Sequence, residues 1–377
     1  MVKRKERLIS LDVFRGITIA GMILVNNPGT WSHIYDPLEH AQWHGWTPTD
    51  LIFPFFLFIV GVAMVYSFNS LESKGVSKKE IYKKVVIRSS LLFAIGVGMA
   101  IFPVFRLEPF RLFDLSTIRI MGVLQRIGLC YLFASIIYLE FRKPLNLAWW
   151  AAGLLGFYWT IMMLVPVPGH GAGQLTMEGN LATYIDNAIL GARTWQPGWE
   201  PEGFLSTIPA IGTVLLGLLT GQLLNSDRSK EDKALYMYVF GSLGLLAGVI
   251  VNQWFPINKG LWTSSYVLLT GGIALLFLAF CYWLIDIKEV KWWTKPFVIF
   301  GMNALAVYVM AELCSKLISM IPAPTGSAGS IKGMIYHDLL LPLTDPINAS
   351  LMFAVGYVVF WLWVMSIFYR KKIFIKI

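Results

Sequence analysis

Long apolar segments alternate with short polar ones from residue 8 to residue 374. Ten of the apolar segments are about 20 residues long, which is the length that an α-helix needs to cross the hydrocarbon core of a bilayer. We expect helices at about 11–27, 49–69, 88–105, 119–140, 145–167, 205–225, 234–252, 263–285, 296–320 and 346–368. The pattern therefore predicts an all-α integral membrane protein with about ten transmembrane helices.

The composition agrees with this prediction. Hydrophobic residues make up 56% of the 377 residues and charged residues only 14%, whereas about 25% charged residues is usual in a soluble domain. No polar block is long enough to form a soluble core of its own, so we expect residues 1–377 to form a single transmembrane domain. Asp12 and Arg15 interrupt the first apolar run, which favours a retained helix over a cleaved signal peptide.

The basic residues that give the net charge of +9 lie between the apolar segments rather than on one face or arm. Such spacing is typical of membrane orientation signals, and it argues against binding of nucleic acid. With ten helices, the segments on the side of the two termini hold 22 of the 31 Lys and Arg residues, and the opposite side holds 7. We therefore expect both termini in the cytoplasm.

The polar segment between the first two predicted helices carries an unusual set of side chains. Residues 26–50 contain three of the five histidines, three tryptophans, three acids and no Lys or Arg. Polar and titratable residues at a membrane boundary are typical of a site of chemistry. A histidine near the start of the second helix, such as His40, can accept a proton at working pH. His40 and His44 have a spacing that suits a metal, but no further Cys or His completes a ligand set, so we expect no metal.

Polar residues also interrupt two of the predicted helices. Arg15 follows Asp12 by three residues, so the two share one helix face and can neutralise each other or hold a polar group. Gln125 and Arg126 lie near the middle of the predicted fourth helix. An unmatched cation inside a membrane costs several kcal/mol, which makes Arg126 a candidate for a ligand or pore residue. The alternative for both pairs is a buried polar network that fixes helix packing.

Eight sequence blocks resemble the family of transmembrane acetyltransferases that includes lysosomal heparan-α-glucosaminide N-acetyltransferase and its bacterial relatives. The blocks are SLDVFRGITI (10–19), ILVNN (23–27), EHAQWHGWTPTDLIFPFFLFIVG (39–61), RIMGVLQRIG (119–128), DNAILG (186–191), PEGFLSTIPAIGTVLLG (201–217), FPINKGLWTSSYVL (255–268) and FGMNALAVYV (300–309). They occur in family order over essentially the whole chain, and a ten-helix core is typical of the family. The chain differs in having His44 where Asn is common and a longer spacer before His40, which affects the acceptor pocket.

The resemblance implies acetyl transfer from cytosolic acetyl-CoA to the amine of a glucosamine-type sugar, as in heparan sulfate, on the periplasmic side. The catalytic histidine of the family corresponds to His40, and the asparagine that works beside it corresponds to Asn26. His40 would act as general base toward the sugar ammonium, and Asn26 would donate a hydrogen bond to the developing oxyanion. An acetyl-histidine intermediate is the alternative route.

The other site residues fall into two groups. For the acceptor sugar we expect Asp50, Trp43, His44, Asn258, Lys259, Trp262, Asn303 and Glu312, and for acetyl-CoA we expect Gln125, Arg126 and Arg15. Asp50 is suited to orienting His40 or holding a sugar hydroxyl, and equally to capping the second helix. Trp43 is equally suited to anchoring the chain at the membrane interface. Packing is the alternative role for Asn258, Lys259, Trp262, Asn303 and Glu312.

Two other functions remain open at this point. A transporter of amino sugars would use intramembrane polar residues and outer aromatic residues equally well, although we find no internal repeat. An O-acetyltransferase that acts on an envelope glycan would use the same donor and the same chemistry. The short loops and the bacterial relatives indicate a multi-pass protein of the bacterial inner membrane, and the family resemblance implies a possible homodimer.

Overall fold

The computed structural model describes residues 8–103, 105–106, 111–112, 115–324 and 329–375. The basic start at residues 1–7, which contributes to the predicted orientation, lies outside these residues. Nine described helices are long and apolar enough to cross a membrane. They are α1 (Ile9–Asn26), α2 (Ile52–Ser73), α3 (Lys78–Ile101), α4 (Val123–Glu140), α5 (Pro144–Leu164), α7 (Thr207–Asn225), α8 (Lys230–Val251), α9 (Ser264–Tyr282, continued as a π-helix over Trp283–Ile287) and α13 (Pro346–Arg370). With α10 (Lys295–Met302) and α11 (Ala304–Met320) counted as one bent span, the total is ten, which confirms the predicted fold class.

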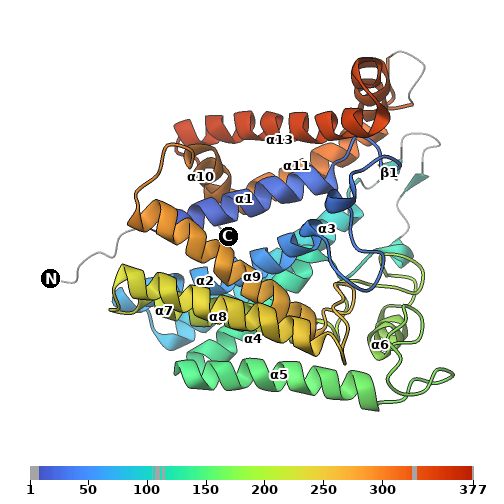
Figure 1. Cartoon of the computed structure of the whole chain (residues 1–377). Coiled ribbons are helices and arrows are strands. Elements are labelled where there is room, and N and C mark those ends of the chain that lie inside the picture. The colour runs from blue at the N-terminus through green and yellow to red at the C-terminus, as the bar shows by residue number, and fades with distance from the viewer. Residues whose placement is uncertain (1–7, 104, 107–110, 113–114, 325–328, 376–377) are drawn as a thin grey trace.

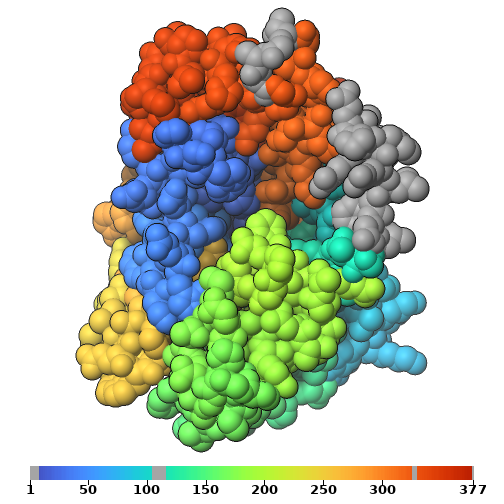
Figure 2. All heavy atoms as spheres, turned by 90° about the vertical axis from the view of Figure 1, so that its right-hand side faces the viewer, coloured from blue at the N-terminus to red at the C-terminus, as the bar shows by residue number. Residues whose placement is uncertain are grey.

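The bundle has two distinct ends (Figure 1). α1 begins and α13 ends at the same end, on the left of Figure 1, which we call the terminal end. The opposite end carries the segments 27–51, 165–206 and 252–263, and we call it the loop end. Figure 2 views the molecule from the loop end. Placement of the terminal end in the cytoplasm remains a prediction from the charge distribution.

Glycines allow the helices of the bundle to approach each other closely. A Cβ atom on Gly61 of α2 would lie 2.1 Å from the carbonyl oxygen of Val214, and one on Gly217 of α7 would lie 2.1 Å from that of Phe58. Small residues at helix interfaces are typical of membrane proteins, where close backbone packing drives association. Large apolar side chains on the outer helices are exposed, as expected of a surface in contact with lipid, and include Leu91, Trp149, Phe157, Leu243, Phe240 and Trp363.

Two predicted helices differ from the structure. The span expected at 296–320 is broken at Asn303, where α10 and α11 meet at an angle of 83°. At this break the Asn303 side chain bonds backbone groups of the C-terminal tail, which holds the tail against the junction of the two helices. α4 begins at Val123 rather than at 119, so the predicted mid-helix position of Gln125 and Arg126 is wrong. Both lie in the first turn, since the preceding residue Gly122 is fully extended.

The long loops contain structure that the hydrophobic pattern did not predict. Helix α6 (Leu181–Leu190) lies within the loop end, and α12 (Ile331–Met334) continues as a π-helix over Ile335–Leu340. Short 3₁₀ turns occur at Asp36–Leu38, Pro48–Leu51, Leu115–Thr117 and Leu341–Leu343, and β1 (Phe105–Arg106) pairs with β2 (Arg111–Leu112). These elements bring residues from distant parts of the sequence together at the loop end.

Candidate functional site

The segment between α1 and α2 presents His40 at the loop end. Asp50 holds this segment together, because its Oδ2 atom accepts backbone N–H groups of Ala41 at 3.1 Å and Thr47 at 3.0 Å. Its Oδ1 atom lies 2.6 Å from Nδ1 of His40. The Tyr266 hydroxyl donates to the backbone carbonyl of Asp50 at 2.5 Å. One carboxylate therefore caps the turn that leads into α2 and also orients the His40 ring.

The two members of this pair differ in exposure. The Asp50 side chain is 1% exposed, whereas that of His40 is 50% exposed. A buried carboxylate bonded to one ring nitrogen fixes the tautomer of the imidazole and leaves the other nitrogen available. His40 is therefore accessible to a substrate while its partner is shielded from water.

Lys259 lies against this pair. Its Nζ atom is 3.0 Å from Nδ1 and 3.1 Å from Nε2 of His40, and 3.4 Å from Oδ1 of Asp50. Near-equal distances to the two ring nitrogens place the amine over the ring face, because an in-plane approach at that range would collide with Cε1. Burial lowers the pKa of Lys259, and the carboxylates of Asp50 and Glu202 oppose that effect.

Asn258 organises the loop that carries Lys259. Its Oδ1 atom accepts the Leu261 N–H at 2.8 Å, and its Nδ2 atom donates to the Trp43 carbonyl at 2.9 Å. The same Nδ2 lies 3.3 Å from Nδ1 of His44, whose pKa is lowered by burial. His40 and His44 therefore contact different side chains, Asp50 and Asn258 respectively. Asn258 is fully buried, so its contacts serve to join two loops of the site.

Trp43 and Trp262 occupy different environments. Trp43 is partly exposed, its indole N–H donates to the Leu175 carbonyl at 2.8 Å, and its ring lies 6.0 Å from that of Trp199. Trp262 is 1% exposed, adopts a positive φ of 52°, and donates to Thr213 at 3.2 Å. Trp43 is therefore partly accessible from outside the protein, whereas Trp262 is packed beneath the loop that carries Lys259.

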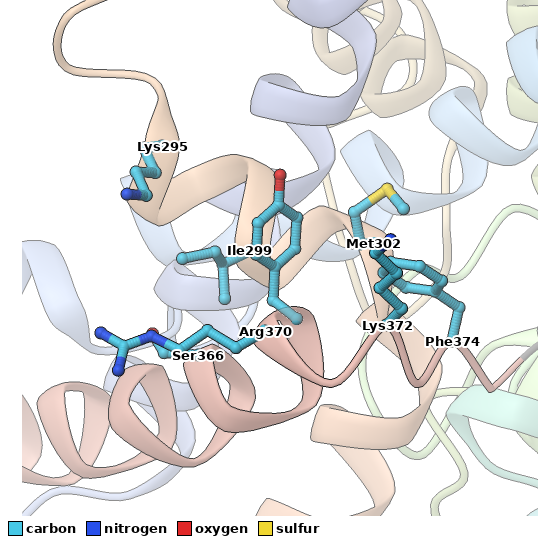
Figure 3. Close-up of a pocket in the computed structure, with 8 residues that line it drawn as sticks. Lys295, Ile299, Met302, Ser366, Arg370, Lys372 and Phe374 are labelled. Carbon is cyan, nitrogen blue, oxygen red and sulfur yellow. The ribbon is translucent and has the colours of Figure 1, made fainter.

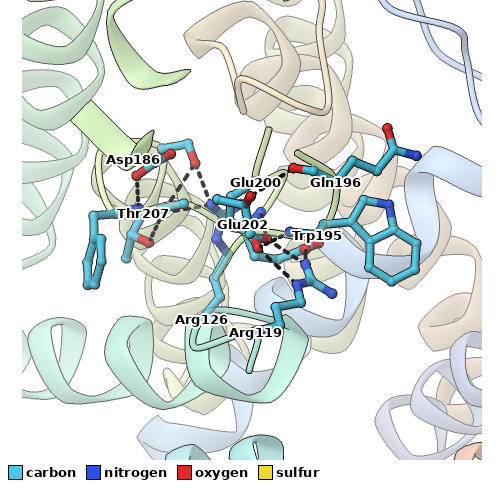
Figure 4. A network of polar contacts seen from close by, with 12 residues as sticks. Arg119, Arg126, Asp186, Trp195, Gln196, Glu200, Glu202 and Thr207 are labelled. Atoms are coloured by element: carbon cyan, nitrogen blue, oxygen red, sulfur yellow. Dashed lines mark hydrogen bonds and ion pairs between the residues drawn. The ribbon is translucent and has the colours of Figure 1, made fainter. Parts of the chain in front are cut away.

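Figure 4 shows a buried ionic cluster formed by Arg119, Asp186, Glu200 and Glu202. The charge of Glu202 also acts on Lys259. The Arg119 guanidinium donates to Glu200, with Nε at 2.9 Å from Oε2, and also to Glu202. Burial opposes ionisation of Glu202, but the charges of Arg119, Arg126 and Lys259 outweigh it and lower its pKa. Burial raises the pKa of Asp186 to about 6, although its Oδ1 atom accepts the Phe204 N–H at 2.8 Å.

Arg126 is completely buried at the edge of this cluster. Its Nη2 atom donates to the Gly203 carbonyl at 3.0 Å and to Ser206, and its guanidinium lies 5.1 Å from the Trp262 ring centre. Its Nε and Nη1 atoms have no hydrogen-bond partner among the residues that the structure describes. Buried donors without partners are costly, so this group is suited to a polar ligand or an ordered water.

Gln125, the neighbour of Arg126, is buried between α4 and α3. A Cβ atom on Gly96 would lie 2.2 Å from Oε1 of Gln125, so only glycine leaves room for this side chain. Gln125 therefore lies within a tight helix interface at the loop end of α4, rather than near the middle of the helix where we expected it.

Asn26 belongs to a second group of polar residues on α1 and α11. Its Nδ2 atom donates to Oε1 of Glu312 at 3.0 Å. Tyr308, Glu312 and Lys316 follow each other at intervals of four residues, so they share one face of α11. Lys316 donates to the Met99 carbonyl at 2.6 Å, at the end of α3. Figure 2 shows a recess between α11, the segment that carries His40 and the green loop of the ionic cluster.

Two of the sequence-predicted site residues lie at the terminal end instead. Arg15 lies 3.2 Å from Asp12 and donates to the Gly301 carbonyl at 3.3 Å. Asn303 bonds the tail that follows α13, with Nδ2 at 3.0 Å from the Ile373 carbonyl. The structure therefore separates Asn303 from the acceptor-side residues with which we grouped it, and it separates Arg15 from Gln125 and Arg126.

Within the described part of the chain, no group of three or more His, Cys, Asp or Glu side chains could hold a metal ion. The site as a whole offers a histidine base (His40) with a fixed carboxylate partner (Asp50) and a nearby amine (Lys259). The buried Arg126 adds hydrogen-bond donors.

Four residues of the ionic cluster were not singled out from the sequence, namely Arg119, Asp186, Glu200 and Glu202. A signal was present, since Glu200 and Glu202 flank a proline directly before an apolar span in a chain with only 22 acidic residues. Their partner Arg119 lies about 80 residues earlier, so the pairing required the fold.

Comparison with known proteins supports a single family. A family model described as "Heparan-alpha-glucosaminide N-acetyltransferase, catalytic" matches residues 7–247. Heparan-alpha-glucosaminide N-acetyltransferase of Homo sapiens is 30% identical over 422 aligned positions, which cover 98% of this chain and 60% of the human protein. The Mus musculus protein of the same name is 32% identical over 82% of this chain and 54% of its own length. The chain thus spans little more than half the length of these relatives.

Proposed function

Since this chain belongs to the heparan-alpha-glucosaminide N-acetyltransferase catalytic family, we propose that it transfers the acetyl group of acetyl-CoA to the amine of a glucosamine-type sugar. The observation that carries this proposal is the 2.6 Å contact between His40 and the buried Asp50, with Lys259 over the ring. Residues 1–377 would act as one transmembrane acyltransferase domain. A passive transporter has no need of a histidine held in one tautomer by a buried carboxylate.

His40 acts as the general base in this mechanism. Its Nδ1–H donates to Asp50, so Nε2 carries the lone pair that takes a proton from the ammonium of the sugar. Asp50 stabilises the imidazolium that results. Lys259 lies over the face of the ring and packs against it. The free amine then attacks the thioester carbonyl, the C–S bond breaks as the amide forms, and the CoA thiolate takes the proton that the amine nitrogen loses.

Asn26 stabilises the oxyanion of the tetrahedral intermediate. One N–H of its side-chain amide is held by Glu312, and an asparagine amide has a second N–H that can donate to the substrate. A fixed donor of this kind contributes about 3 kcal/mol to the transition state. Glu312 is therefore a residue that positions Asn26.

Acetyl-CoA approaches from the terminal end, which we propose to be cytoplasmic, and Arg15 lies on that side. The free Nε and Nη1 donors of Arg126 hold a polar group of the donor near its reactive end, and Gln125 supports the adjoining wall. The sugar enters from the loop end, which we propose to face the periplasm of a bacterial inner membrane. Trp43 and His44 contact it there, while Asn258 and Trp262 shape the loop beneath.

Turnover of acetyl-CoA by the detergent-purified chain tests this function, with glucosamine and short glucosaminides as acceptors. We expect acetyl transfer to nitrogen in the parent and its loss in His40→Ala, with binding of acetyl-CoA retained. His33→Ala is the matched control, because His33 is an exposed histidine of the same segment, and we expect parental turnover from it.

Other results would contradict the proposal. If the sugar binds but acetyl-CoA neither binds nor reacts, the protein is a sugar transporter. If the product carries its acetyl group on oxygen, the acceptor is a hydroxyl of a glycan. An acetyl adduct on His40 in a quenched reaction would replace direct transfer with a two-step route.

A further inference from the structure

A pocket at the terminal end lies between α10, the end of α13 and the C-terminal tail (Figure 3). Its volume is about 520 Å³, which is within the usual range of ligand pockets. The lining residues are Lys295, Ile299, Met302, Ser366, Tyr369, Arg370, Lys372 and Phe374. The pocket lies at the opposite end of the bundle from His40, so the acceptor-side chemistry does not account for it.

The fold builds this pocket by fixing the tail against the break between α10 and α11. The Asn303 side chain bonds the tail twice, to the Ile373 carbonyl and to the Ile375 N–H, each at 3.0 Å. Lys372 closes the turn after α13 with a positive φ of 55°, and its N–H donates to the Tyr369 carbonyl at 3.1 Å. The wall that carries Lys372 and Phe374 is thus held in one conformation.

All the charged side chains that line the pocket are cations. Its lining contains Lys295, Arg370 and Lys372 and no Asp or Glu. None of the three cations forms an ion pair with an acidic side chain in the described parts of the chain. In Figure 3 the Lys295 amine and the Arg370 guanidinium lie on one side of the pocket, and Lys372 lies on the other with Phe374.

Helix electrostatics explain only part of this arrangement. Arg370 and Lys372 lie at the C-terminal end of α13, where a cation is stabilised by the helix dipole. Lys295 is the first residue of α10, where the dipole disfavours a cation. Orientation signals require cations at this end of the bundle, but they do not require them around one cavity. An anionic ligand accounts for all three positions.

We propose that this pocket binds a phosphate group attached to an apolar or aromatic body. Arg and Lys are the side chains that recognise phosphate, and Tyr369, Phe374 and Ile299 supply the surface for the attached body. The same chemistry is present in the nucleotide phosphates of CoA and in the headgroup of an anionic phospholipid. The inference concerns binding alone and does not depend on the acetyl transfer proposed for His40.

Two binding measurements on the full chain test the inference and distinguish these sources. The first is calorimetric titration of CoA, and the second is the rise in melting temperature on addition of phosphatidylglycerol, relative to phosphatidylcholine. The test variant is Lys295→Gln with Arg370→Gln. The control is Lys291→Gln with Lys371→Gln, which removes the same charge from exposed terminal-end positions outside the pocket lining. All four side chains are exposed, so both variants are expected to fold.

We expect the test variant to lose about tenfold or more in affinity for one probe, since each cation near an anionic group contributes several-fold. The control variant should bind as the parent does. A loss confined to CoA assigns the pocket to nucleotide phosphates, and a loss confined to phosphatidylglycerol assigns it to a lipid headgroup. The proposal is overturned if neither probe binds the parent, or if test and control variants bind both probes equally. Neither measurement involves turnover, so a failure of the proposed activity would be a separate result.

Discussion

The ionic cluster at the loop end and the pocket at the terminal end both contain several cations, but only some of the loop-end cations lie beside carboxylates. At the loop end, Arg119 bonds Glu200 and Glu202, and Lys259 lies 3.4 Å from Asp50. At the terminal end, the three cations of the pocket line a cavity without a carboxylate. Paired charges hold side chains in fixed positions, whereas unpaired charges remain available to an anion from outside the protein.

This difference supports the proposal that the two ends of the bundle serve different purposes, catalysis at the loop end and anion binding at the terminal end. Chemistry at His40 needs preorganised groups, since the contribution of a base or a hydrogen-bond donor depends on its geometry before the substrate arrives. Recognition of a phosphate needs accessible positive charge, and some freedom of the side chains is tolerated there. Removal of single charges at the loop end should show how far charge pairing there determines function and stability.

The largest expected effect comes from breaking the contact between Asp50 and His40. In Asp50→Asn the amide keeps an oxygen that can cap the turn but removes the negative charge that stabilises the imidazolium. We expect kcat to fall on the order of 10³- to 10⁴-fold, with little change in acetyl-CoA affinity. Steady-state kinetics and titration measure the two effects.

Asp36→Asn is the control for this prediction, because Asp36 is an exposed acid of the same segment. Its kcat should match that of the parent. A correctly folded Asp50→Asn protein with kcat within about threefold of the parent would remove His40 from its proposed role as an oriented base.

A change at Arg119 tests the pairing of buried charges directly. Arg119→Gln leaves Glu200 and Glu202 buried without their cation, and breaking a buried ion pair costs about 3–5 kcal/mol. We expect a marked fall in melting temperature in detergent. The exposed Arg193 is the control position, and Arg193→Gln should melt as the parent does.

A second substitution separates charge from packing at this site. If the loss in Arg119→Gln arises from unpaired carboxylates, then adding Glu202→Gln should restore part of the stability. A double variant that is less stable than Arg119→Gln would show that packing of the arginine, rather than its charge, is what the cluster needs.

The sequence was sufficient for those features that depend on local pattern. The apolar spans predicted the helices because a membrane helix needs a continuous run of about 20 apolar residues. The contact between His40 and Asp50 was also foreseen as one role of Asp50, since the two residues lie within ten positions in one segment. The predicted catalytic roles of His40 and Asn26 stay predictions.

Features that depend on contacts between distant residues could not be predicted from local sequence patterns. Arg119 pairs with acids about 80 residues later, and no periodicity links the two segments. The break at Asn303 was hidden because α10 and α11 are both apolar, and the groups that bond Asn303 come from the tail beyond α13. The position of Arg126 was misjudged because the apolar pattern continues through residues 119–122, where the backbone is not helical.

The smallest of these effects concerns Asp186, an acid of the cluster that is bonded by backbone rather than by a cation. Burial raises the pKa of Asp186 to about 6 from an ordinary value of 3.8. The folded state thus holds a proton that the unfolded state has lost between these values, so this group makes the protein less stable as pH rises from about 4 to 6. Asp186→Asn should be more stable than the parent above pH 6, by up to about 3 kcal/mol.

Melting curves of both proteins from pH 4 to pH 8, with Asp227→Asn as the exposed control, measure this difference. A difference that does not grow with pH would mean that nearby cations keep Asp186 ionised, as Arg119 does for Glu202.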